Sequence, residues 1–99
     1  MNQLFKQFET GEVALAEGGY HSADKPWNAH PSFKGVYLKH LVTGAETGGQ
    51  LSCHLVRIDP GCAIEDHLHD GKLEIHEVIG GSGECMIEQK AVPYTAGQL

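Results

Sequence analysis

The sequence predicts an all-β fold, and three features of the chain after residue 33 support this. Short runs rich in β-branched and aromatic residues follow one another at close spacing. Glycine-rich turns separate these runs, and the 99-residue chain contains 13 glycines. A helical period of 3.6 residues is not visible there. Short strands joined by tight turns are typical of a β-sandwich or a β-barrel.

The expected strands follow from these runs and from the turn signals between them. They are expected at residues 36–42, 51–58, 74–79, 84–88 and 91–95. Residues 43–49 contain three glycines and are predicted to turn the chain after the first strand. Asp59-Pro60-Gly61 is a strong turn signal after the second strand. The last two strands are expected to form a hairpin around Gln89-Lys90.

The first third of the chain gives a weaker signal. Residues 1–34 are polar and are interrupted by Gly18-Gly19 and by two prolines, so we expect an irregular N-terminal extension. Leu4, Phe5 and Phe8 fit one helical turn and a short strand equally well. Residues 35–99 are expected to form the single β domain, since a chain of this length is sufficient for one domain.

Composition and charge exclude several classes of protein. The net charge of −6 and the lack of a Lys/Arg cluster argue against nucleic acid as a partner. An apolar run of about 18 residues, which a membrane span needs, does not occur. The first residues lack the apolar run of a signal peptide, so we expect a cytoplasmic protein. Three cysteines without CxxC spacing do not indicate a disulfide framework or a zinc ribbon.

The chemistry of the chain is concentrated between residues 61 and 81. His67 and His69 alternate with Leu68, so both imidazoles would lie on one face of an extended strand. Glu74 follows after a short turn at Asp70-Gly71. Two imidazoles and one carboxylate from adjoining strands can converge on one first-row transition metal. We therefore predict a metal site formed by His67, His69 and Glu74. The alternative interpretation is that these three are solvated loop residues.

This stretch resembles the first signature motif of the cupin superfamily. That motif is Gly, five residues, His-x-His, three or four residues, Glu, six residues, Gly. The matching positions are Gly61, His67, His69, Glu74 and Gly81. The resemblance covers roughly residues 35 to 99 and implies a small jelly-roll β-barrel with a divalent metal, such as Fe, Mn, Ni or Zn, in its cavity.

A second cupin motif would begin with Gly, five residues, Pro-x-Gly, two residues, His. Gly97 resembles its first glycine, and the sequence ends two residues later. The resemblance therefore implies a barrel that lacks its last strands and its fourth ligand. We expect a shortened form of a longer product, whose missing wall comes from the extension, from the N-terminal segment or from a partner chain. An open sheet edge favours pairing, so a homodimer is expected.

Several functions are compatible with this pattern, because one fold hosts many chemistries. The metal could serve an enzyme, or the barrel could be a non-catalytic module that binds or senses a small molecule; a metal-free structural barrel is the third possibility. His76 is a weak candidate for an acid or base, and Tyr94 and Tyr37 are weaker ones. The sequence leaves open whether His54 faces the cavity. Glu77 should face away from Glu74 by strand alternation.

Overall fold

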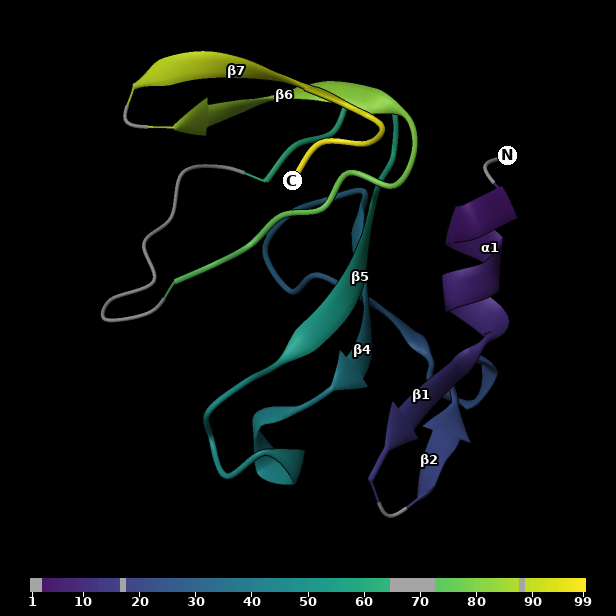
Figure 1. Cartoon of the computed structure of the whole chain (residues 1–99). Coiled ribbons are helices and arrows are strands. Elements are labelled where there is room, and N and C mark those ends of the chain that lie inside the picture. Colours follow the sequence, from purple (N-terminus) through teal and green to yellow (C-terminus); the bar gives the residue numbers. More distant parts are fainter. Residues whose placement is uncertain (1–2, 17, 65–72, 88) are drawn as a thin grey trace. The chain divides into compact units, whose positions relative to one another are not determined.

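The computed structural model describes residues 3–16, 18–64, 73–87 and 89–99. The chain divides into two compact units, one of residues Gln7–Glu65 and one of Met1–Lys6 with Asp66–Leu99. The described strands form three small antiparallel sheets, with the strand orders β1-β2, β3-β4-β5 and β6-β7 (Figure 1). The β-rich character predicted from the sequence is thus confirmed. Within the described residues, none of the three sheets closes into a barrel.

The first unit contains the largest sheet. Its strands are β3 (Trp27–Ala29), β4 (Val36–Val42) and β5 (Cys53–Ile58). The predicted strand 36–42 coincides with β4, and the strand predicted at 51–58 begins two residues later, at Cys53. A 3₁₀ turn, η2 (Gly44–Glu46), lies in the predicted turn between them. The buried apolar residues are Val36, Leu41 and Leu55, so the core of this unit lies on the β4–β5 pair.

One face of this sheet also holds a buried lysine and a layer of aromatic rings. The register places Lys39 opposite both Trp27 and Leu55. The Lys39 side chain is 3% exposed, and its ammonium donates to the carbonyl oxygens of Glu9 and Ser22. The Arg57 guanidinium lies 5.1 Å from the centre of the Trp27 ring and 4.4 Å from that of Tyr37. Cation–π contacts and hydrogen bonds therefore hold together the polar groups on this face.

The N-terminal segment, which we expected to be irregular, contains regular elements. They are α1 (Gln3–Thr10), β1 (Glu12–Leu15), β2 (Gly18–His21), the 3₁₀ turn η1 (Ser22–Asp24) and β3. The expectation was wrong because Gly18-Gly19, interpreted as a break, lies in β2 and pairs with Leu15 and Ala14 of a hairpin. Leu4, Phe5 and Phe8 lie in α1, which decides between helix and strand. Helix α1 is too short to span a membrane, and no described helix is long and apolar enough to do so.

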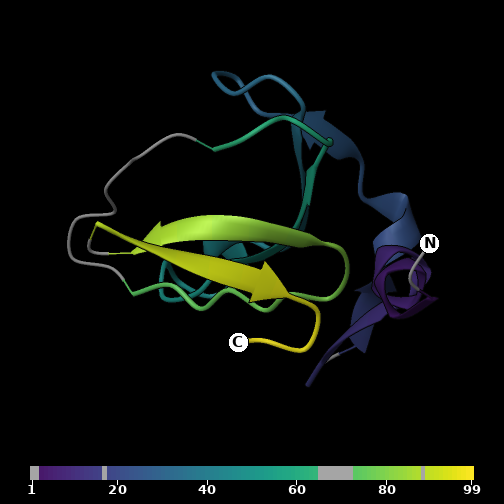
Figure 2. The ribbon, with the colours of Figure 1, turned by 90° about the horizontal axis from the view of Figure 1, so that it is seen from above.

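The described part of the second unit is built on the hairpin of β6 (Ser82–Ile87) and β7 (Lys90–Thr95), as predicted (Figure 2). Its register pairs Cys85 with Val92 and Gly83 with Tyr94. These four residues therefore share one face of the hairpin. Cys85, Val92 and Tyr94 are half-buried, whereas the neighbouring residues on the other face are exposed. Through Tyr94, this face contacts His76 of the segment that carries the described part of the candidate site.

The strand predicted at residues 74–79 is not formed. Residues 73–79 have no regular secondary structure. The backbone of Val78 is bonded to the C-terminal turn: its N–H donates to the Gln98 carbonyl, and its carbonyl accepts from the Gly97 N–H, both at 2.9 Å. A strand needs a continuous ladder of such bonds with a neighbour, and these two bonds meet at a single residue. The apolar alternation of this segment was therefore misleading.

Candidate metal centre

Of the three predicted ligands, the structure describes Glu74. His67 and His69 lie outside the described residues. Among residues 3–16, 18–64, 73–87 and 89–99, no group of three or more His, Cys, Asp or Glu side chains is placed to hold a metal ion. The metal site proposed from the sequence therefore remains a prediction, and the structure contributes the surroundings of its carboxylate.

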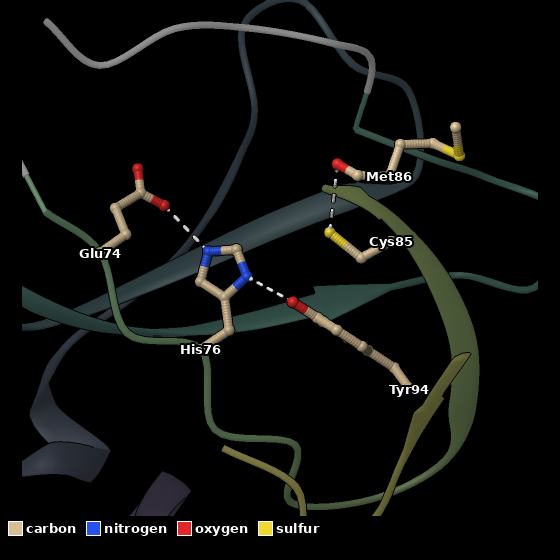
Figure 3. Close-up of polar contacts among 5 residues, drawn as sticks. All are labelled: Glu74, His76, Cys85, Met86 and Tyr94. Carbon is tan, nitrogen blue, oxygen red and sulfur yellow. Dashed lines mark hydrogen bonds and ion pairs between the residues drawn. The ribbon is translucent and has the colours of Figure 1, made fainter. Parts of the chain in front are cut away.

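The Glu74 carboxylate is bonded to His76. Its Oε1 lies 2.9 Å from Nε2 of His76, and the other ring nitrogen, Nδ1, lies 3.1 Å from the Tyr94 hydroxyl (Figure 3). The rings of His76 and Tyr94 meet edge to face, with centroids 6.2 Å apart at 84°. The side chains of His76 and Glu74 are 52% and 39% exposed, so the pair is accessible to solutes. The two side chains are therefore in direct contact, although the strand expected to carry both is not formed.

The polarity of this chain of hydrogen bonds follows from the groups involved. An ionised carboxylate can only accept, so Nε2 of His76 must carry the proton that it donates to Glu74. In a neutral ring, Nδ1 is then an acceptor, and the Tyr94 hydroxyl donates to it. A metal needs an ionised carboxylate, and this arrangement stabilises that form while fixing the orientation of Glu74. The described groups therefore fit the role of a supported carboxylate ligand.

The surroundings of Tyr94 favour its protonated form. A hydrogen bond with the Cys85 side chain, partial burial and the charge of the Cys85 thiolate all raise the pKa of Tyr94 above 10.0. The Cys85 thiol also lies 3.9 Å from the Met86 carbonyl oxygen (Figure 3). A tyrosine that keeps its proton remains a hydrogen-bond donor to His76 at neutral pH. Cys85 therefore adds to the preference of Tyr94 for its protonated form, and the Tyr94 hydroxyl contacts His76.

The two glycines of the cupin-like motif have a structural reason of their own. Gly61 has a φ of 77° and Gly81 a φ of 78°. Side chains with a Cβ disfavour this left-handed region by roughly 1–2 kcal/mol. Both positions border the stretch that carries the histidines and Glu74. The motif therefore places glycine at two positions where the backbone requires it.

The remaining candidates fall in two groups. Tyr37 and His54 belong to the first unit: Tyr37 lies on β4 under Arg57, and His54 lies on β5 opposite His40. Glu77 and Glu74 are both exposed, so burial does not distinguish these two carboxylates.

The role of Cys85 beside Tyr94 was not predicted from the sequence. The register of the predicted hairpin would have been the signal, because it places Cys85 diagonally across from Tyr94.

Comparisons with protein-family models, with curated proteins and with solved structures found no match for this chain.

Proposed function

We propose that this chain is a cupin-like protein whose His67, His69 and Glu74 hold one divalent transition metal in a jelly-roll barrel. The observation that carries the proposal is the motif in which these three residues stand at fixed spacing between Gly61 and Gly81. The positive φ of both glycines is compatible with it, because glycine is the residue that adopts this conformation most readily. Two imidazoles and one carboxylate suit Fe, Mn, Ni or Zn.

The contacts of His76 favour a binding function over a catalytic one for this residue. Both of its ring nitrogens are engaged, one by Glu74 and one by Tyr94. A general acid or base must reach a substrate proton, which His76 could do only after giving up one of these bonds. We therefore assign His76 as a positioning residue for the Glu74 carboxylate. The metal would supply open coordination positions and Lewis acidity to a small polar molecule in the barrel cavity.

We further propose that the protein is a homodimer. The described part of the second unit exposes a group of large apolar side chains. They are Leu4, Leu73, Ile75, Met86, Ile87 and Leu99, with exposed fractions from 47% to 101%. Large apolar side chains exposed on a small unit favour a partner that covers them, where they form a continuous patch. A molar mass of one chain by light scattering at micromolar concentration would contradict the dimer.

The metal site is tested by elemental analysis of protein purified without added metal. The wild type should carry about one metal ion per chain, and His67→Ala or His69→Ala should abolish it because each removes one of few ligands. Glu74→Gln should abolish it as well, since a neutral amide is a much poorer ligand. His76→Ala should weaken binding by about 10- to 100-fold, as is usual for a residue that orients a ligand.

Glu77→Gln is the matched control, because it makes the same chemical change in the same segment. It should retain the metal. Loss of metal from Glu77→Gln with retention in Glu74→Gln would show that Glu77, and not Glu74, is the carboxylate ligand. Wild-type protein that neither carries nor takes up metal would instead favour a metal-free structural barrel.

A further inference from the structure

A pair of histidines faces each other across two strands of the first unit. β4 and β5 are antiparallel, and their register places His40 directly opposite His54. The ring centroids lie 5.7 Å apart, and the ring planes meet at 66°. Both side chains are exposed to solvent. Neither residue belongs to the cupin-like motif, so the function proposed above leaves the pair unexplained.

The backbone at this point is irregular in a way that bears on the pair. The register shifts between His40 and Val42, which leaves Leu41 as an extra residue in β4. Such a β-bulge changes the direction of the side chains beside it and is common next to functional sites. Here Leu41 is buried while His40 is exposed beside the ring of His54. The bulge therefore allows Leu41 to lie in the core while its neighbour His40 lies beside His54.

The surroundings of the pair are favourable for a cation. The next residue pair on the same face is Leu38 and Val56, which carry no charge. Lys39, the nearest cation along β4, is turned to the other face, where its ammonium donates to the carbonyls of Glu9 and Ser22. A bound metal therefore meets no lysine on its own face from the neighbouring positions of these strands. The net charge of −6 also favours cations.

We propose that His40 and His54 form a two-imidazole site for a divalent transition metal. Metal–nitrogen bonds are about 2.0–2.1 Å long, which places the metal about 3 Å from each ring centre and the two centres about 5–6 Å apart. The separation of 5.7 Å between the His40 and His54 rings falls in this range. Imidazole ligands suit Zn²⁺, Ni²⁺ and Cu²⁺, and water completes the coordination. A metal bound in this way joins β4 to β5.

The experiment uses Ni²⁺ as the probe, in the full chain carrying His67→Ala and His69→Ala. This background removes the metal site proposed above, so that the two proposals succeed or fail separately. Calorimetric titration should show one Ni²⁺ ion bound per chain. His40→Gln or His54→Gln should weaken this binding at least tenfold, since each removes one of two ligands. These substitutions retain polar, exposed side chains of similar size and should leave the fold unchanged.

His21→Gln is the matched control. His21 is exposed on β2 and lies beside Glu12, at 3.8 Å, rather than beside a second histidine. It should leave the Ni²⁺ affinity unchanged. Paramagnetic broadening by Ni²⁺ in nuclear magnetic resonance spectra, which needs no further variant, should centre on the ring signals of His40 and His54. Equal affinity in all three glutamine variants, or broadening centred on other residues, would overturn the proposal.

Discussion

Replacement of Lys39 by methionine tests how a charged side chain stabilises the core of the first unit. The Lys39 ammonium donates to the carbonyl oxygen of Glu9 at 2.7 Å and to that of buried Ser22 at 2.8 Å. It thereby joins β4 to the end of α1 and to η1. Trp27 strengthens the same junction, because its indole N–H donates to the Glu9 carboxylate at 2.7 Å.

The expected loss follows from these contacts. Hydrogen bonds from a charged group contribute about 1.5–3 kcal/mol each. The Ser22 carbonyl keeps a second donor, the Lys25 N–H at 3.0 Å, so the loss falls mainly on Glu9. Methionine retains the apolar stem and removes the cost of burying an ammonium. We therefore expect Lys39→Met to lower the free energy of unfolding by about 2 kcal/mol. The melting temperature should fall by about 8–16 °C.

Urea denaturation followed by circular dichroism measures this loss, and an unchanged m-value would show that both states keep their compactness. Lys34→Met is the matched control, because Lys34 is exposed; it should change stability by less than about 0.5 kcal/mol. If Lys39→Met and Lys34→Met denature at the same urea concentration as the wild type, the reasoning is refuted. The burial cost of the ammonium would then cancel its hydrogen bonds.

Three further predictions concern metal and pH. Metal at 100 times its dissociation constant should add about 2.7 kcal/mol, a melting shift on the order of 10–20 °C; identical melting curves of metal-loaded protein with and without a chelator would contradict the site. The Thr43 backbone N–H, at 2.9 Å, is the main cause that lowers the pKa of Glu46 below 4.5. This stabilisation is complete above the unfolded pKa and is lost as pH falls through the folded one, so Glu46→Gln should reduce the acid dependence of stability in urea titrations. The Cys85 contact raises the pKa of Tyr94 above 10.0. That stabilisation is complete below 10 and is lost as pH rises through the folded pKa, so Cys85→Ala should move tyrosinate absorbance toward lower pH, and no movement would argue against the contact.

Local signals predicted the elements whose partners are close in sequence. The β6–β7 hairpin was predicted because two apolar runs flank the short turn at Gln89-Lys90. β4 was predicted from its β-branched and aromatic residues. The strand expected at residues 74–79 failed, because alternation shows only that a segment can pair and not that a neighbour is present. The N-terminal hairpin was missed because Gly18-Gly19 was interpreted as a break.

The candidate site divides in the same way. The motif predicts Glu74 as a ligand, and the spacing of two residues predicts His76 beside it; the structure shows the two side chains in contact. The part played by Cys85 depends on the hairpin register, which sets Gly83 opposite Tyr94. Register is a property of two strands and of the turn between them, so it has to be worked out for the whole hairpin and not from one strand.

The sequence alone determined the β-rich character of the chain and its acidic charge, and it carries the prediction of metal chemistry between Gly61 and Gly81. Only the tertiary structure decided that Lys39 is buried and that the rings of His40 and His54 meet. The physical reason is that local preferences act between residues close in sequence, whereas these contacts depend on a bulge and on pairing between separate strands. Identical residue types at other positions have other surroundings: Lys34 is exposed, and His21 lies beside a carboxylate.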